Sequence, residues 1–397
     1  MPGISGETLR AWRRSRGWDV PKTAQQLRQA AGDDPMPVHD ALVRMIYRWE
    51  RGEHALSERY ELLYQALGLG DGQHPGQPGG AVAVGHGTLT RARLDTLSAG
   101  QLDELIHLLE DQWHVLVRTD NLFGPRHALG GVRDQIGVID ALLRSVRLPL
   151  RLKVLQLGAK YAESAAWLHE DSGDLAGSRY WTGRSMEWAL EAGDRQMMSW
   201  VLYRRGEHAA AGGDAAATAG LAAAARREGG DLPDPMLAAI FQQEAHAHAL
   251  DGAEAACLTA LDQARERAAS DDPGDASSGH GSFCTAAYVE MQRGRCWLRL
   301  GRPAKARAAL DSAVRALPPI YRRDRGVALS ALAAACAAVG EPTEAATTAM
   351  QALKVARDAG SERIVSMVIP VATALARHRD LEAVSQLHQT LAESPSA

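Results

Sequence analysis

Four side chains suited to DNA recognition lie within eight residues of one another near the N-terminus: Arg44, Tyr47, Arg48 and Arg51. Arg44 and Arg48 are four residues apart, so on a helix they share one face, as contacts with adjacent base edges require. Arginine is the commonest specific reader of guanine in the major groove, and a tyrosine can contact a phosphate or a thymine methyl group. The pattern predicts a helix that enters the major groove of double-stranded DNA.

The residues around this segment predict a small helical domain that presents it. Helices are expected over residues 6–16, from about residue 19, over 40–51 and over 57–67, with a break at 32–37. On the Arg-rich helix, Ile46 and Trp49 are three residues apart on the side away from the arginines, which favours packing against the other helices. Glu50 is expected to hold this helix in place by pairing with Arg10 or Arg13.

The distribution of charge matters more here than its sum. The 397 residues carry 44 Lys and Arg against 48 Asp and Glu, a net charge of −4, and residues 1–70 carry ten basic residues against nine acidic ones. This is not the basic domain that non-specific nucleic-acid binding favours. The arginines are clustered, however, and Lys22, near the start of the second helix, is a candidate phosphate contact, although a free surface lysine is an equal alternative.

The rest of the chain predicts an all-α protein that ends in an α-solenoid. Residues 71–92 are rich in Gly and Pro and are expected to be a flexible linker between a helix-turn-helix domain (1–70) and a repeat domain (93–392). Turn-forming glycines recur at intervals of 39, 40 or 49 residues, the longest interval containing a loop insertion at 270–279. Twelve residues after each glycine stands a small residue, which lets neighbouring helices approach closely. These are the pairs Gly173/Ser185, Gly213/Ala225, Gly252/Ala264, Gly301/Ala313 and Gly340/Ala352.

The inner surface of such a solenoid is lined by the first helix of each pair and can form a ligand groove. Polar and aromatic residues fall on three of these helices, although half or more of them are expected to pack within or between repeats. The candidate groove residues are Trp200, Tyr203, Arg204, Gln242, Gln243, His246, Tyr288, Gln292 and Arg295.

Several function classes are disfavoured by the sequence. It contains no Walker loop, no Gly-x-Ser-x-Gly and no dinucleotide fingerprint, so we expect neither an enzyme nor a cofactor. Its four cysteines lack paired spacing and its histidines lack metal-ligand spacing, so we expect no disulfide and no metal site. The charged N-terminus is unlike a signal peptide and no apolar run is long enough to span a bilayer, so a cytoplasmic protein without membrane contact is expected.

Two family resemblances can be placed on these residues. The segment Ile46-x-x-Trp49-Glu50-Arg51-Gly52 resembles the end of the recognition helix in the Cro/repressor-type helix-turn-helix (XRE) family, although the turn before the helix is stretched to about residues 32–39. Residues 150–392 resemble tetratricopeptide repeats, most clearly at Leu300-Gly301 with Ala313. The arrangement is similar to actinobacterial XRE regulators that carry a C-terminal repeat domain.

The resemblance implies a sequence-specific transcriptional regulator, expected to be a homodimer. Its repeat domain would dimerise, sense a peptide, a small molecule or a protein, or do both. Peptide-sensing relatives hold their peptide with asparagines from the repeat helices, whereas this chain has a single asparagine, Asn121, ahead of the repeats. The alternative is an adaptor whose repeats recruit a protein partner without specific DNA binding, which the near-neutral charge of residues 1–70 favours.

Overall fold

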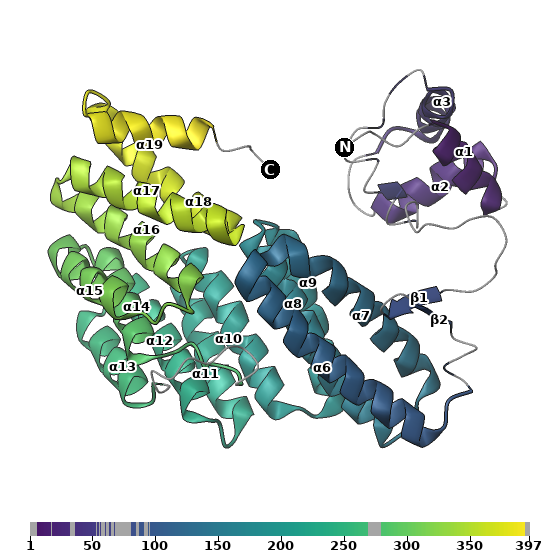
Figure 1. The fold of residues 1–397 in the computed structure, drawn as a ribbon, viewed down its shortest axis with the longest axis horizontal. Coiled ribbons are helices and arrows are strands. Elements are labelled where there is room, and N and C mark those ends of the chain that lie inside the picture. Colours follow the sequence, from purple (N-terminus) through teal and green to yellow (C-terminus); the bar gives the residue numbers. More distant parts are fainter. Residues whose placement is uncertain are drawn as a thin grey trace. The chain divides into compact units, whose positions relative to one another are not determined.

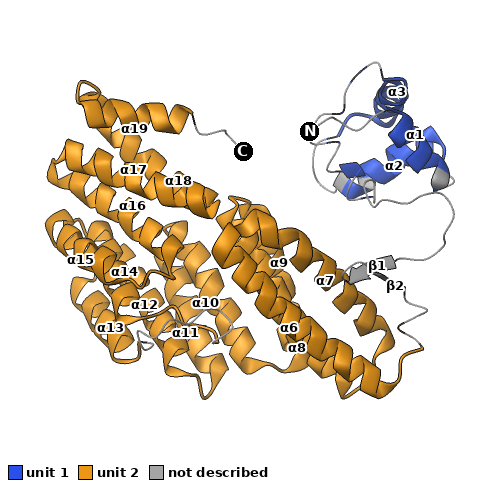
Figure 2. Cartoon of the chain, in the orientation of Figure 1, with its two compact units in different colours: residues 1–80 blue, residues 81–397 orange. Residues whose placement is uncertain are grey.

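The computed structural model describes residues 6–393 except 17, 32–35, 53, 55, 57–59, 61–62, 65–66, 68–80, 85–86, 91–93, 95 and 269–278. The chain divides into two compact units, residues 1–80 and residues 81–397 (Figure 2). In the described part of the chain, every element is helical except one short hairpin. The predicted all-α fold class is confirmed.

Unit 1 contains the helices α1 (Gly6–Ser15), α2 (Val20–Ala31) and α3 (His39–Glu50) (Figure 1). The α2 helix begins where the sequence predicts, because the Asp19 carboxylate accepts a hydrogen bond from the Lys22 backbone N–H at 2.7 Å. The three helices meet in an apolar core of their own, which includes Leu9, Leu27, Leu42, Ile46 and Trp49. Most of the helix expected over 57–67 lies outside the described residues, as do residues 32–35 of the predicted break.

A two-stranded hairpin lies within the range predicted to be a flexible linker. Strands β1 (Ala81–Val84) and β2 (Gly87–Thr90) pair antiparallel, with Ala81 opposite Thr90. Residues 71–80, 85–86 and 91–92 of that range lie outside the described part of the chain. Part of the expected linker therefore has regular structure.

Unit 2 is built from consecutive antiparallel helices, which run through the blue, teal, green and yellow parts of Figure 1 from α6 to α19. They are α6 (Ala99–Phe123), α7 (Pro125–Ser145), α8 (Leu150–Asp171), α9 (Leu175–Ala192), α10 (Arg195–Ala211), α11 (Ala215–Gly229), α12 (Asp234–Leu250), α13 (Glu254–Glu266), α14 (Ala286–Arg299), α15 (Pro303–Ala316), α16 (Arg322–Val339), α17 (Pro342–Ala359), α18 (Glu362–Leu375), the 3-10 turn η2 (Ala376–His378) and α19 (Glu382–Ala392). The pairs α8/α9, α10/α11, α12/α13, α14/α15 and α16/α17 are packed most closely. The predicted α-solenoid is confirmed.

The predicted repeat signals have the expected structural roles. Each of the five glycines lies between the two helices of a pair with a positive φ, from +68° at Gly301 to +88° at Gly340. This left-handed conformation costs little only for glycine. The small residues twelve positions later all lie buried in the second helix of a pair, where Ser185 also donates a hydrogen bond to the carbonyl of Ala159 at 2.9 Å.

The solenoid has one feature that its repeats do not predict: helices near its start touch helices near its end. In a simple solenoid each repeat contacts only its neighbours. Here α8 contacts α18 and α6 contacts α17. Gly124, with φ +91°, lies so close to the carbonyl oxygen of Ala359 that a Cβ atom there would collide with it. We call this contact between the two ends of unit 2 the seam.

Polar side chains tie the seam together. The Asp171 carboxylate is fully buried at the end of α8 and accepts hydrogen bonds from Ser361 at 2.6 Å and Arg323 at 3.1 Å. Arg323 also forms a bidentate pair with Asp120 of α6, at 2.6 and 3.0 Å. A buried ion pair of this kind fixes which elements meet, because an unpaired buried charge is costly.

Candidate functional sites

The α3 helix presents an arginine-rich face and buries its other side. Arg44, Tyr47 and Arg48 are exposed, and Tyr47 keeps 48% of its surface accessible. Arg51 is exposed as well. The sequence predicts that the helix ends at Arg51, but α3 ends at Glu50, so Arg51 is the first residue after it. Arg48 contacts His54, so its guanidinium is not isolated. Three predicted DNA-contacting residues on α3, and Arg51 directly after it, are thus all accessible.

The end of α3 is anchored to α1 through Glu50. Its carboxylate is buried and accepts two hydrogen bonds from Arg13, at 2.6 and 2.8 Å, and Arg10 donates to its backbone carbonyl at 2.6 Å. Hydrogen bonding to Glu50 raises the pKa of Arg13 further. The predicted structural role of Glu50 is confirmed, and this pairing sets the orientation of the arginine-rich face.

Replacing Arg13 with alanine should lower the free energy of unfolding of unit 1. The change leaves the Glu50 carboxylate buried without its bidentate partner, for which we expect a loss of about 3 kcal/mol in the free energy of unfolding. Tryptophan fluorescence during urea unfolding measures it, since Trp49 lies in this core. Arg14→Ala, at an exposed position of the same helix, is the control and should change stability by less than about 0.5 kcal/mol. Equal effects of the two changes would refute the anchoring role.

Lys22, the predicted phosphate contact, is exposed in the first turn of α2. Its ammonium group donates a hydrogen bond to the side chain of Gln25 at 3.1 Å. An exposed contact of this kind is easily exchanged, so Lys22 remains a candidate without further support.

The nine predicted groove residues divide into two groups. Trp200, Arg204 and Tyr288 line a pocket in unit 2. The others do not line it and bond within or between repeats: Gln242 donates to the Tyr203 hydroxyl at 3.2 Å, Gln243 donates to the Gly206 carbonyl at 2.8 Å, Gln292 bonds to His246 at 2.9 Å, and Arg295 donates to Gln292 at 3.0 Å. Burial lowers the pKa of His246 well below its usual value, so this side chain stays neutral. These six residues do not line the pocket, and their contacts agree with the expectation that half or more of the nine pack within or between repeats.

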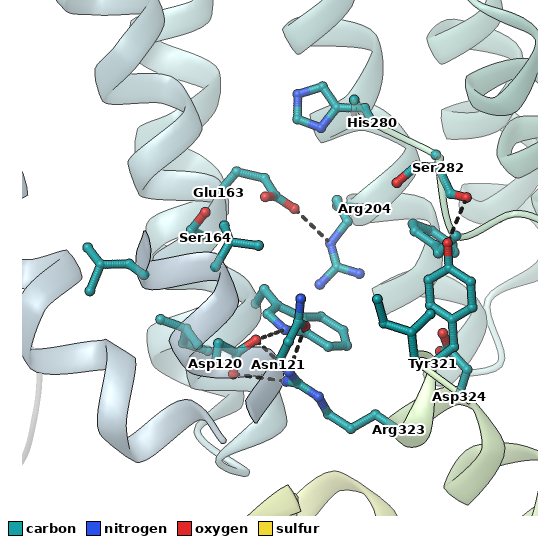
Figure 3. Close-up of a pocket in the computed structure, with 18 of the residues that line it drawn as sticks. Asp120, Asn121, Glu163, Ser164, Arg204, His280, Ser282, Tyr321, Arg323 and Asp324 are labelled. Atoms are coloured by element: carbon teal, nitrogen blue, oxygen red, sulfur yellow. Dashed lines mark hydrogen bonds and ion pairs between the residues drawn. The ribbon is translucent and has the colours of Figure 1, made fainter. Parts of the chain in front are cut away.

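The pocket lies at the seam and has a volume of about 200 Å³. Its walls come from both ends of the solenoid: α6, α8 and α10 on one side, the start of α16 and α18 on the other, with residues 279–283 between them. Aromatic side chains make up much of the lining. They are Trp113, Trp167, Trp200, Phe283, Tyr288 and Tyr321, and His280 stacks on Trp200 with ring centroids 5.0 Å apart. Figure 3 labels several polar residues of this lining, among them Asp120, Arg204 and Asp324.

Three arginines lie within cation–π distance of the ring of Trp167, which lines the pocket. The guanidinium carbons of Arg204, Arg323 and Arg363 lie 5.4, 5.6 and 4.7 Å from the ring centroid, within the range of cation–π attraction. The indole N–H of Trp167 donates to Asp120, the partner of Arg323, at 3.3 Å. One tryptophan thus contacts charged groups from α10, α16 and α18.

Each of these arginines is already paired with carboxylates. Arg204 bonds to Glu170 at 2.7 Å and to Glu207 at 2.5 Å, and lies 3.7 Å from Glu163, the contact drawn in Figure 3. Arg363 lies 3.3 Å from Asp171. Although burial acts to raise the pKa of Glu170, Arg204 holds it well below its usual range. The arginines are therefore neutralised by the protein itself.

One carboxylate in the lining has no such partner. Asp324, in the first turn of α16, makes no hydrogen bond or ion pair with any residue that the structure describes. Burial raises its pKa to about 6, an effect that Arg363 and Arg323 offset only in part. The pocket thus contains an acid that is ionised at neutral pH at an energetic cost.

Replacing Asp324 with asparagine should therefore stabilise the empty protein in a pH-dependent way. Because the folded pKa lies above the unfolded value of 3.8, the wild type loses stability as the pH rises from about 4 to about 6. We expect a gain of about 1–3 kcal/mol for Asp324→Asn above pH 6, shrinking toward pH 4. Urea unfolding at pH 4.5 and pH 8 tests this, and a gain that is equal at both values would contradict it.

The sequence did not identify several of the residues that form this site. Asp120 lies in α6, ahead of the recognised repeats, and its partner Arg323 is 203 residues away. Trp167, Asp324 and Arg363 likewise carry no local motif. One weak sequence signal pointed toward this site. Asn121, the single asparagine of the chain, lines the pocket next to Asp120.

Three further findings concern the described residues. They include no group of three or more His, Cys, Asp or Glu side chains arranged to hold a metal ion. None of the described helices combines the length and the apolar character needed to cross a membrane. All four cysteines are buried and free, as predicted.

Comparison with known proteins does not show a family for this chain. No protein-family model matches the chain, and no curated protein matches it in sequence. Among solved structures, the chain is similar to the crystal structure of the P58(IPK) TPR domain at 2.5 Å, with 13% sequence identity over 99% of this chain and 98% of that one and a TM-score of 0.23. The chain contains an α-solenoid of paired helices and a small separate helical unit.

Proposed function

We propose that the chain is a sequence-specific DNA-binding transcriptional regulator whose repeat unit binds an effector. The observation that carries the proposal is the exposed face of Arg44, Tyr47 and Arg48 on a helix whose other side is buried and whose end is anchored by Glu50. A helix packed in this way can enter a major groove without losing its fold. The resemblance of residues 46–52 to the XRE family adds support.

In this proposal residues 1–70 are the DNA-binding domain, 71–92 the linker and 93–392 the effector-binding and dimerising domain. A homodimer would place two α3 helices in major grooves one helical turn, or a multiple of it, apart. The pocket at the seam is the proposed effector site, since its walls come from both ends of the solenoid and a ligand there would favour their contact. Such a regulator acts in the cytoplasm.

Selection of bound fragments from a genomic library by the full chain tests the proposal. We expect a single enriched sequence motif, which the Arg44→Ala/Arg48→Ala variant fails to enrich. Circular dichroism must show that the variant keeps the helical content of the wild type. Enrichment of the same motif by both proteins, or of none by the wild type at modest salt, would contradict the proposal.

A second function is favoured by a different observation. Leu108, Val115 and Leu122 recur every seven residues along α6 and keep 46%, 60% and 61% of their surface accessible. An exposed apolar stripe of this kind suits a protein partner, so the chain could act as an adaptor without specific DNA binding. Replacing Val115 and Leu122 with serine should abolish recruitment of a partner in a pull-down while leaving any DNA selectivity unchanged, which separates the two functions.

A further inference from the structure

The pocket at the seam has an excess of negative charge. Three buried or partly buried arginines, Arg204, Arg323 and Arg363, face six carboxylates. The carboxylates are Asp120, Glu163, Glu207 and Asp324 in the lining, and Glu170 and Asp171, which pair with these arginines outside the lining. Arg322, exposed at the rim, reduces the excess from three to two.

Among the described lining residues, the buried arginines are already paired, and Arg322 at the rim is the cation left to meet an anionic ligand. The guanidinium groups of Arg204 and Arg323 are each bonded to two carboxylates. Arg363 pairs with Asp171, and its Nη2 atom, which has no hydrogen-bond partner, is inaccessible to solvent. The accessible wall is instead aromatic, with Asp324 as the carboxylate left without a partner among the described residues.

From this arrangement we infer that the pocket binds an organic cation: a primary ammonium group on an aromatic or branched apolar body. The ammonium would pair with Asp324, and the body would lie against the aromatic wall near Trp200 and Tyr321. Tryptophan and tyrosine faces attract cations and also bury apolar surface. A cavity of about 200 Å³ suits a group of roughly the size of a phenylethyl chain.

The organic cation would be the effector of the proposed regulator, and this role rests on the proposed function. Binding of the cation to the pocket can be measured whether or not the chain binds DNA. The ammonium can come from a free amine or from the N-terminus of a peptide. Both sources present the same charge to Asp324. A short amine and a longer peptide amide with the same terminal group distinguish them.

Three probes of one shape and different charge test the inference on the full chain: phenethylammonium, 2-phenylethanol and phenylacetate at pH 7.5. Trp113, Trp167 and Trp200 line the pocket, so intrinsic fluorescence reports binding. We expect saturable binding of the ammonium, at least tenfold weaker binding of the alcohol, and none of the carboxylate. A tripeptide amide that begins with phenylalanine should bind more tightly than phenethylammonium if the source is a peptide, and more weakly if it is a small amine.

Asp324→Asn should weaken binding of the ammonium at least tenfold and leave that of the alcohol nearly unchanged. Asp358→Asn, at an exposed ion pair with Lys354 on α17, is the matched control and should change neither. Binding should also weaken as the pH falls below about 6, where Asp324 takes up a proton. The charged and titratable groups around Asp324 are Arg323, Arg363, Asp171, Glu207, Tyr288 and Cys284.

Equal binding of the three probes, a preference for phenylacetate, or unchanged ammonium binding by Asp324→Asn would overturn the inference. Because the readout is fluorescence of the repeat unit, this failure leaves DNA selection by the wild type intact. A failure of DNA selection would equally leave amine binding intact, so the two proposals fail separately.

Discussion

Arg323→Ala is expected to lower the free energy of unfolding of unit 2 by about 3–5 kcal/mol. The change removes the bidentate partner of Asp120 and one of the hydrogen bonds to Asp171, leaving two carboxylates buried at the seam with too little compensating charge. Urea unfolding followed by circular dichroism measures the loss. Because the seam joins residues about 200 positions apart, we also expect a more open unit 2 in small-angle X-ray scattering.

A matched control is available in the same solenoid. Arg307 on α15 also bonds to two carboxylates, Glu341 at 2.8 Å and Glu344 at 2.7 Å, but this cluster is exposed. Exposed ion pairs contribute little, so Arg307→Ala should cost no more than about 1 kcal/mol. If both changes cost the same, the ends of the solenoid are not held together by the buried pair.

The Arg44→Ala/Arg48→Ala variant is expected to lose 10²- to 10⁴-fold in affinity for its selected DNA sequence. Each bidentate contact between arginine and guanine contributes about 1–3 kcal/mol of discrimination, and the variant removes two. Fluorescence anisotropy with a labelled duplex measures the affinity. The fold should be unaffected, since both side chains are exposed and the core residues Ile46 and Trp49 are unchanged.

The Lys22→Ala variant distinguishes the loss of a sequence-specific base contact from the loss of a sequence-independent phosphate contact. A lost phosphate contact weakens selected and unrelated sequences alike and lowers the salt dependence of binding by about one unit of slope. The double variant should instead lose its preference between sequences. A uniform loss in the double variant as well would mean that Arg44 and Arg48 act only as positive charges.

Most of the fold could be predicted because its signals are local. A glycine such as Gly340 stands where only a left-handed residue can turn the chain, and a small residue such as Ala352 stands where two helices touch. The spacing of Ile46 and Trp49 likewise indicates the buried side of α3. Such patterns repeat within a few turns of helix, so the sequence displays them directly.

The site was predictable only in part, for two physical reasons. First, a polar residue on an inner helix face has the same sequence signature whether it lines a pocket or bonds to the next repeat. Gln243, which donates to the Gly206 carbonyl, and Trp200, which lines the pocket, were therefore indistinguishable. Second, the seam depends on contacts between Asp120 and Arg323, whose separation along the chain exceeds that of any local pattern.

Guanine methylation interference on a selected duplex tests most directly whether the arginine face of α3 reads DNA. Methyl groups at guanine N7 project into the major groove, where Arg44 and Arg48 would contact the bases. If Arg44 and Arg48 contact the bases, methylation of specific guanines should interfere with binding of the wild type. This interference should disappear with the Arg44→Ala/Arg48→Ala variant. Interference confined to adenine N3 in the minor groove, or the same guanine pattern with both proteins, would contradict it.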